Sequence, residues 1–506
     1  MRVKNSFLNV SSNFIIIFLK IILAFVVRTV FINKLGEEYL GIDGLFINIL
    51  NMISLTELGI GTAINYLLYK PLANKDYKKV STIMSFFKRT YFIIGLIVSA
   101  IGIIIMFFIP SIVGNISIDV NLYLIFALYL INTVFIYFIS YKDTLILADQ
   151  RNYKLTGIYV SINILTSIFQ IVVLFLYRSF ILYLVVQLVL NFIQRIIINK
   201  YIGKLYTEVD FYSKEKMTKS EKKEIKKNVG AMFLHKAGFY IVNSTDNIII
   251  STFLNVSLVG IYTNYLSLVN MVTTALNTLF MSITSSFGNL VVAEGKSTQK
   301  NTFNVLNFTA SILYGYVTIG FALFINNFIC LWIGEGYLLS TEIVLLMCLN
   351  FYLLGMISPI DIVRQASGKY TKDKYVSILQ AISNLIISIV LVKQIGLIGV
   401  VIGTTISTFF FPVLVKPYVI YKYVFESDFK EYYLNYFINL ILLVLTYLGL
   451  NYLFSNILIN VSWLNFFIRL ILYTIIYMAL YLVLNIRNNN FKFYKELIKN
   501  RRKKHE

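Results

Sequence analysis

A small set of charged side chains lies inside stretches of sequence that are otherwise apolar. Charge is expensive in a hydrocarbon environment, so side chains of this kind mark ligand or ion sites by default. Basic members suit an anionic ligand such as a phosphate or diphosphate, and acidic members suit a coupling cation or proton. The residues concerned are Lys20, Arg28, Asp43, Glu57, His235, Lys236 and Asp246.

Lys20 and Arg28 are eight residues apart, which in a helix is about 80° around the axis and about 12 Å along it. Both can therefore line one broad wall of a water-filled cavity. There Arg28 would hold a phosphate through bidentate hydrogen bonds and Lys20 as a compact charge. For Arg28 an ion pair with Asp43 is the alternative, because a hairpin turning near residue 36 places the two at one level. For Lys20 the alternative is snorkelling to the membrane interface.

His235 and Asp246 are eleven residues apart, so on one helix they share a face at about 20°. Asp246 at mid-membrane predicts a site for Na⁺ or H⁺, and the alternative is a buried carboxylate hydrogen bonded by its chain neighbours. His235 and Lys236 are predicted substrate contacts, with solvation at the interface as the competing account. Glu57 and Asp43 join Asp246 as candidates for ion coupling or gating.

The segments that must position these residues are long apolar stretches between residues 11 and 485 of a chain that is 58% hydrophobic. A bilayer core needs about 20 apolar residues per helix, and unpaired backbone groups cannot sit in hydrocarbon. The sequence therefore predicts an all-α polytopic membrane protein of about fourteen transmembrane helices.

Positive charge is distributed unevenly over the predicted loops. Most of the 45 Lys and Arg residues lie on one side, whereas only Lys34, Arg178 and Lys393 lie in the loops of the other. This asymmetry predicts that both termini are cytoplasmic. The net charge of +21 is thereby explained by topology and by contact with anionic lipid, so nucleic acid is not an expected partner.

A faint internal repeat organises the chain. Residues 40–53 (LGIDGLFINILNMI) align with residues 259–272 (VGIYTNYLSLVNMV), and the repeat offset, which takes position 40 to position 259, covers six predicted helices. An even number predicts two parallel six-helix lobes, with the substrate site where they meet. We expect a first lobe at 1–202, a second at 229–430, two further helices at 431–485 and a basic tail at 486–506.

The segment 203–228 that joins the two lobes is rich in lysine and glutamate. It predicts a cytoplasmic basic linker, partly helical, and a regulatory or lipid-sensing role is the alternative. Two histidines and two cysteines do not make a metal site, and no Walker-type phosphate loop is present. No cofactor is expected beyond a coupling Na⁺ or H⁺. Because the external loops are short, we expect a transporter and not an enzyme.

Three stretches, 35–73, 235–265 and 361–407, resemble bacterial polysaccharide flippases. These are the Wzx-type lipid-linked oligosaccharide exporters of the multidrug/oligosaccharidyl-lipid/polysaccharide superfamily. The resemblance implies two lobes that rock between inward-open and outward-open states in the bacterial cytoplasmic membrane. It implies that an undecaprenyl-diphosphate-linked oligosaccharide is flipped to the outer leaflet, with membrane lipids as surroundings and a polysaccharide polymerase and glycosyltransferases as partners.

Related flippases of lipid-linked peptidoglycan precursors use cationic residues of the first helix, which favours Lys20 and Arg28 as headgroup contacts. The alternative function is a cation-coupled multidrug extruder of the same superfamily. Such a protein needs an acidic cavity, and the cationic bias of the intramembrane residues argues against it.

Overall fold

A computed structural model provides the structure of the chain. The residues that it describes are 19, 21–54, 60–114, 116–219, 222, 237–238, 240–242, 244–368, 372–455, 461–485 and 491.

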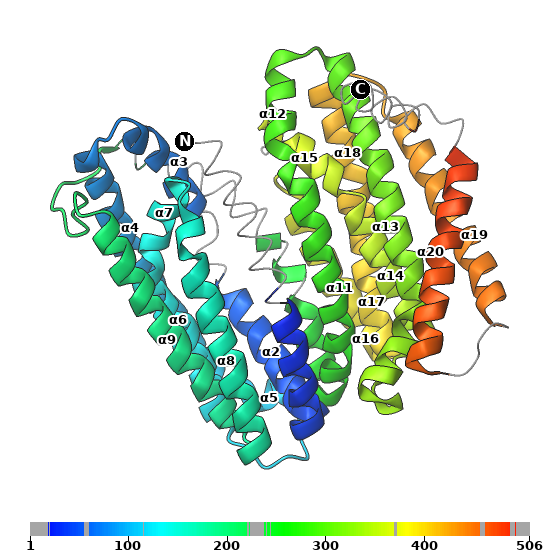
Figure 1. Cartoon of the computed structure of the whole chain (residues 1–506), viewed down its shortest axis with the longest axis horizontal. Coiled ribbons are helices and arrows are strands. Elements are labelled where there is room, and N and C mark those ends of the chain that lie inside the picture. The colour runs from blue at the N-terminus through cyan, green and yellow to red at the C-terminus, as the bar shows by residue number, and fades with distance from the viewer. Residues whose placement is uncertain are drawn as a thin grey trace, which may run out of the picture. The chain divides into compact units, whose positions relative to one another are not determined.

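The described residues form helices joined by turns and short irregular segments, and no strand occurs among them (Figure 1). Residues 21–35 are helical. The α-helices that follow are α2 (Glu37–Ile53), α3 (Ile60–Ala73), α4 (Tyr77–Met106), α5 (Ile109–Val113), α6 (Leu122–Ile139), α7 (Asp143–Ala148), α8 (Thr156–Tyr177), α9 (Phe180–Leu205), α11 (Val256–Ser282), α12 (Thr284–Ala293), α13 (Lys296–Ile333), α14 (Thr341–Gly355), α15 (Ser358–Ser367), α16 (Val376–Ile395), α17 (Leu397–Thr408), α18 (Leu414–Ile420), α19 (Lys430–Ser455) and α20 (Trp463–Asn485).

Shorter helical turns fill the breaks between these helices. Their bounds are η2 (Ser140–Lys142), η3 (Asn152–Leu155), η4 (Glu335–Tyr337), η5 (Phe409–Val413) and η6 (Tyr421–Phe425), the last two being π-helical.

Eleven of the helical segments in the described part of the chain are long and apolar enough to cross a bilayer. They confirm the predicted class, a polytopic all-α membrane protein. Each matches one of the fourteen predicted spans, and the other three predicted spans contain residues outside the description. The total of fourteen therefore stays a prediction.

The internal repeat extends beyond the short stretch of sequence that reveals it. The repeat offset takes the first residue of α4 to the first residue of α13, and the first residue of α6 to the first residue of α14. It also takes Ala148, the end of the span built from α6 and α7, to Ser367, the end of the span built from α14 and α15. The left-handed turns that follow, at Gln150 and Gly368, correspond to within one position. An offset first visible in a short stretch of sequence thus relates two successive spans of the first copy to two successive spans of the second.

Local sequence explains where several of these helices begin. Asp76 caps α4 by accepting a hydrogen bond from the Lys79 amide at 3.0 Å, and Asn121 caps α6 in the same way through Leu124. Gly36 precedes α2 with a φ of 91°, which favours glycine. Because α4 begins at its cap, it starts thirteen residues before residue 90, where its long apolar run begins.

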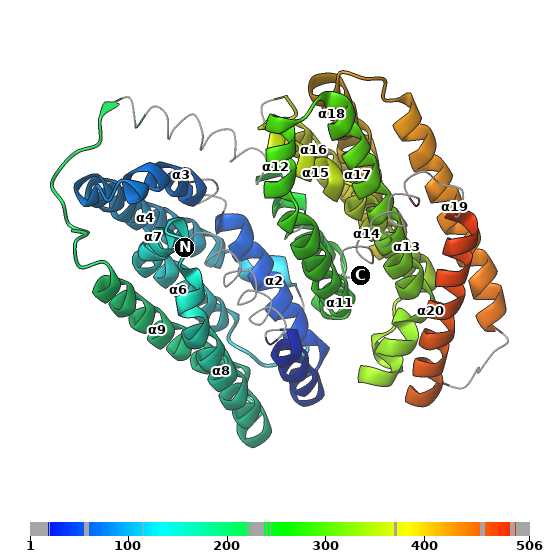
Figure 2. The same cartoon turned by 45° about the horizontal axis from the view of Figure 1, so that its top comes forward.

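The chain divides into two compact units, Met1–Thr263 and Asn264–Glu506. This boundary lies inside α11, whereas the predicted lobe limits at 202 and 229 follow the repeat, and those limits stay predictions. In the first unit α6 packs on α4 and α9, and α9 packs on α8. In the second unit α13 packs on α14, α19 and α20 (Figure 2). The second unit's core is aromatic, and Gly355 admits the ring of Tyr314 where a Cβ would lie 2.1 Å from it.

Candidate functional site

Two of the predicted site residues, Arg28 and Asp43, lie in the first unit and are held by separate partners. The Arg28 guanidinium donates a hydrogen bond to Thr263 Oγ1 at 3.3 Å. The Asp43 carboxylate accepts a hydrogen bond from the hydroxyl of Tyr129 on α6. No ion pair joins Arg28 to Asp43 among the described contacts, although each lies within reach of the other's charge. The direct ion pair with Asp43, which was the alternative to a cavity-lining role for Arg28, is thus not found among these contacts.

Aromatic side chains surround this pair. Tyr183 of α9 lies within range of both charges and beside Gln170 of α8. Its ring meets Phe31 edge to face, with centroids 5.2 Å apart. Five N–H donors on a guanidinium can serve several acceptors, and Thr263 takes one. The site can therefore offer an anion a cation and hydroxyl groups, because the carboxylate of Asp43 is bound to Tyr129 and not to that cation.

Close helix packing places Thr263 beside Arg28. A Cβ at Gly41 on α2 would lie 2.0 Å from the Val256 carbonyl oxygen, and a Cβ at Gly260 would lie 2.2 Å from the Glu37 carbonyl oxygen. Gly44 makes room for the Thr263 methyl group, which would lie 2.8 Å from its Cβ. Only glycine fits these positions, so α2 lies directly on the first turns of α11.

The two close contacts are related by the repeat. The repeat offset takes Gly41 to Gly260, and it takes Glu37 to Val256. The two contacts are therefore equivalent: Gly41 packs on the backbone of Val256, and Gly260 packs on the backbone of the corresponding residue, Glu37. The Gly-Ile pair that reveals the repeat in the sequence has this packing as its physical basis.

Asp246 is buried, with 6% of its surface exposed, on a helical stretch with the equally buried Ser244, Thr245 and Asn247. Its charge acts on the hydroxyl of Tyr262, which is buried on α11. The repeat offset takes Arg28 to Asn247 and Asp43 to Tyr262. The first copy of the repeat thus carries a cation and an acid at positions where the second carries two neutral polar residues.

Four predicted site residues lie outside the described residues. They are Lys20, Glu57, His235 and Lys236. Their roles as substrate contacts or gating groups stay predictions, as do those of Arg28, Asp43 and Asp246.

One ion pair of the first unit was not predicted from the sequence. Asp143 begins α7, directly after the turn η2 that interrupts the span built from α6 and α7, and pairs with Arg195 of α9 at 2.5 Å. The second unit repeats this arrangement. Asp361 corresponds to Asp143 to within one position of the repeat offset, and it lies in the first turn of α15 and pairs with Lys416 of α18 at 3.1 Å. The side chains of the two aspartates are 28% and 29% exposed.

The pair in the second unit belongs to a larger network. Arg364 bridges Asp361 and Asp373, with a distance of 2.9 Å to each. The 1% exposed Asp373 carboxylate therefore has a cationic partner. The signal that finds these residues is the repeat: an acid follows the break of the corresponding span in each copy, and a basic residue lies within a later span of the same copy.

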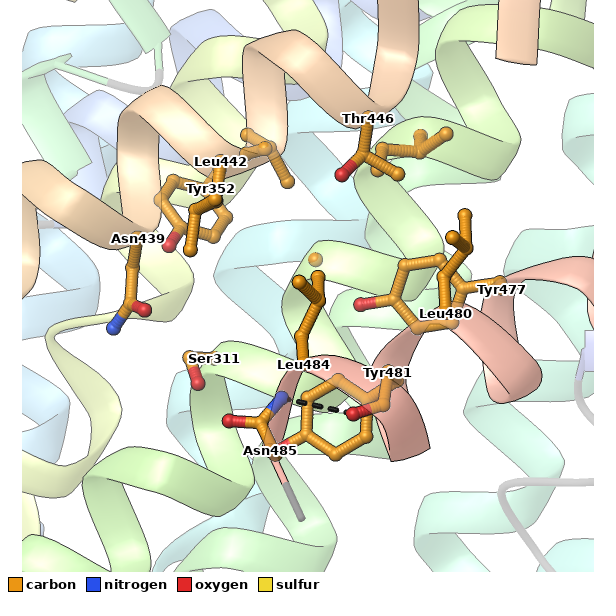
Figure 3. A pocket seen from close by; sticks show the side chains of 13 residues that line it. Ser311, Tyr352, Asn439, Leu442, Thr446, Tyr477, Leu480, Tyr481, Leu484 and Asn485 are labelled. Atoms are coloured by element: carbon orange, nitrogen blue, oxygen red, sulfur yellow. Dashed lines mark hydrogen bonds between the residues drawn. The ribbon is translucent and has the colours of Figure 1, made fainter. Parts of the chain in front are cut away.

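A cavity of about 150 Å³ lies in the second unit between α13, α14, α19 and α20 (Figure 3). Tyrosine, asparagine and leucine side chains line it, and Asn485 donates a hydrogen bond to the Tyr481 carbonyl oxygen at 3.0 Å. No charged side chain is among the lining residues. This cavity therefore cannot neutralise a diphosphate, and it suits an uncharged or apolar group.

Known proteins resemble this chain in sequence and in fold. The sequence profile of a family described as "Polysaccharide biosynthesis protein" matches residues 78–342, more than half of the chain. Among curated proteins no sequence matches significantly. The fold is similar to that of the lipid II flippase MurJ in an inward closed conformation, with a TM-score of 0.65 at 18% identity over 97% of this chain and 100% of that one.

Two MATE transporter structures share the fold as well. An inward-facing MATE family transporter of the MOP superfamily has a TM-score of 0.61 at 16% identity, over 80% of this chain and 94% of that one. A MATE transporter of Vibrio cholerae has a TM-score of 0.55 at 14% identity, over 84% of this chain and 100% of that one. At such identities the likeness concerns the fold alone.

Proposed function

Since the chain belongs to the family of polysaccharide biosynthesis proteins, we propose that it flips undecaprenyl-diphosphate-linked oligosaccharide repeat units across the bacterial cytoplasmic membrane. The family match carries the proposal, because it ties a transporter fold to the assembly of polysaccharide. The lipid II flippase that shares the fold moves a lipid-linked substrate, which supports the same class of cargo.

Arg28 supplies the chemistry that this substrate needs. A diphosphate presents several anionic oxygens, and a guanidinium binds such oxygens in a bidentate geometry that an ammonium cannot provide. The hydroxyl of Thr263 holds the guanidinium in place and can exchange its hydrogen bond for one to substrate. Lys20, eight residues before Arg28, is the proposed second cation.

The direction of transport follows from the predicted topology. Both termini lie in the cytoplasm in this proposal, and the substrate enters from the inner leaflet and leaves to the outer one. Asp246, Glu57 and Asp43 are the proposed coupling or gating groups, through which a gradient of Na⁺ or H⁺ resets the carrier. Glycosyltransferases that build the repeat unit and a polymerase that consumes it are the proposed partners.

A second candidate function is a cation-coupled multidrug extruder. It is favoured by the fold shared with MATE transporters and by the buried Asp246, which would suit a cationic drug. The two candidates differ in the charge of the cargo, and one assay can compare them.

Reconstitution tests the proposal directly. Proteoliposomes carrying a polyprenyl-diphosphate oligosaccharide on one leaflet should equalise it between leaflets faster than vesicles without protein. A cationic dye in the same vesicles should not be extruded. Dye extrusion without flipping would replace the proposal with the drug-extruder function.

A further inference from the structure

The described part of the predicted linker is a strap bound to the first unit. We define the linker strap as residues Tyr206–Met217, which follow α9 and run past the start of α4 (Figure 1). The Asp210 amide donates a hydrogen bond to Ser81 Oγ at 2.8 Å, and the Tyr206 hydroxyl donates one to Asp149 at 2.7 Å. Val209, Phe211 and Met217 are buried. The linker therefore begins as fixed structure.

Two lysines of the first unit lie under the aromatic side chains of this strap. The Lys88 ammonium of α4 is 3.2 Å from the ring centroid of Tyr212, and the Lys142 ammonium of η2 is 4.4 Å from that of Phe211. The two ammonium groups are close enough for each to repel the other. Cation–π contacts offset part of that repulsion and leave the outward-facing donors of each ammonium for another partner.

The acidic residues of the strap are committed elsewhere. Glu215 pairs with Lys78 at 2.9 Å, and Glu208 lies beside the hydroxyl of Tyr77. The Asp210 carboxylate accepts the amide of Tyr212 at 2.8 Å. In the described ranges no carboxylate is paired with Lys88 or Lys142. Within that part of the chain, two cations thus lie together without an acidic partner.

Both lysines lie at the depth of the lipid headgroups. Lys142 comes twenty residues after Leu122, the start of α6, which is about 30 Å along the span. Lys88 comes eighteen residues before Met106, the end of α4, which is about 27 Å. These lengths equal the hydrocarbon thickness of a bilayer, about 30 Å. In the predicted topology this end of each span faces the cytoplasmic leaflet.

The second copy of the repeat lacks this pair. The repeat offset takes Lys88 to Asn307, and Ile360 stands before Asp361 as Lys142 stands before Asp143. The ion pairs next to these positions recur in both copies, so the fold does not require the two lysines. Their presence in one copy points to a ligand rather than to packing.

We propose that Lys88, Lys142 and the Tyr212 side chain bind the phosphate group of an anionic phospholipid in the cytoplasmic leaflet. Two ammonium groups bridge the phosphate oxygens, and the Tyr212 ring, 75% exposed, covers the headgroup at the interface. Lipid bound here fixes the linker strap to α4 and η2. This site does not depend on the cargo of the transporter.

The test measures retention of phosphatidylglycerol by the purified full-length protein, titrated in detergent and counted by native mass spectrometry. The single variants Lys88→Gln and Lys142→Gln should each raise the phosphatidylglycerol concentration at half-saturation about fivefold, which is the effect of one lysine near an anionic surface. The double variant should raise it about 25-fold. The matched control is Lys216→Gln, an exposed lysine of the same strap, which should bind within about twofold of the wild type. A wild-type midpoint in the double variant would overturn the proposal.

Two further arms identify the occupant. Phosphatidylcholine should bind no more tightly to the wild type than to the double variant. If inorganic phosphate saturates the two lysines in lipid-free detergent, the ligand is a free phosphate and the lipid assignment is wrong. Should the glutamine variants fail to fold, the Lys88→Arg/Lys142→Arg variant keeps the charge and should bind like the wild type. In that case the wild-type protein is titrated with phosphatidylglycerol at increasing salt. An affinity that added salt does not lower would overturn the proposal.

Discussion

Replacing Gly41 by alanine should force α2 away from the start of α11. The new Cβ would lie 2.0 Å from the Val256 carbonyl oxygen, about 1 Å or more short of an ordinary contact. The obstacle is helix backbone, which cannot rotate aside as a side chain can. The two helices must therefore separate by about 1 Å. Thr263 lies two turns further along α11, and Arg28 lies on the helical segment 21–35 that leads into α2. The same separation therefore lengthens their 3.3 Å contact beyond hydrogen-bond range.

The free energy of unfolding should fall by about 1–3 kcal/mol from the overpacking. Loss of a hydrogen bond to a charged group adds about 1.5–3 kcal/mol if nothing replaces it. Equilibrium unfolding in detergent measures the sum. Gly449→Ala is the matched control, because Gly449 lies in the middle of α19 with open space around it. That change should leave stability unaltered or raise it by up to about 1 kcal/mol.

Gly260→Ala should cost a similar amount, and the double variant should cost less than the two single changes together, since both separate the same crossing. Equal free energies of unfolding for the Gly41→Ala and Gly449→Ala variants would show that α2 and α11 have room for a Cβ where they cross. The link from glycine packing to the position of Arg28 would then be refuted.

Two other contacts give further predictions. Asp143→Asn should lower the free energy of unfolding by about 1.5–3 kcal/mol, because it leaves Arg195 without its carboxylate, and the exchanged pair Asp143→Arg/Arg195→Asp should recover part of it in chemical unfolding. Asp373→Asn should cost more, about 3–5 kcal/mol, since that carboxylate is 1% exposed. Hydrogen bonding by Lys78 lowers the pKa of the exposed Glu215 below its usual 4.5, so the strap contact is complete above that value and is lost as the pH falls through the lowered pKa. Limited proteolysis of the linker strap should accelerate below pH 4.5, and Glu215→Gln should remove this pH dependence.

The helical class and the repeat could be predicted from the sequence because both rest on local pattern. Apolar runs of bilayer length identify spans without knowledge of tertiary contacts. The Gly-Ile pair exposed the repeat because the same close crossing constrains both copies. The starts of helices were predicted less well, since α4 begins at its Asp76 cap and not where its apolar run begins.

The partners within the site could not be predicted. Thr263 is 235 residues from Arg28, and Tyr129 is 86 residues from Asp43. Equal depth in a hairpin suggested that Arg28 and Asp43 form an ion pair. Instead, each is hydrogen bonded to a hydroxyl group of another helix. The Asp143 and Arg195 pair was overlooked because Asp143 lies at a break, where a charge resembles one at the end of a span.

The proposed cationic site is tested most directly by the rate at which Arg28→Gln flips a polyprenyl-diphosphate oligosaccharide in proteoliposomes. Loss of charge-assisted hydrogen bonds worth about 1.5–3 kcal/mol predicts that the apparent affinity for this substrate, taken from the dependence of the rate on its concentration, is about ten- to a hundredfold weaker. The control Arg89→Gln changes an exposed arginine of α4 and should flip the substrate like the wild type. Wild-type flipping by a folded Arg28→Gln protein would contradict the assignment of Arg28 to the diphosphate.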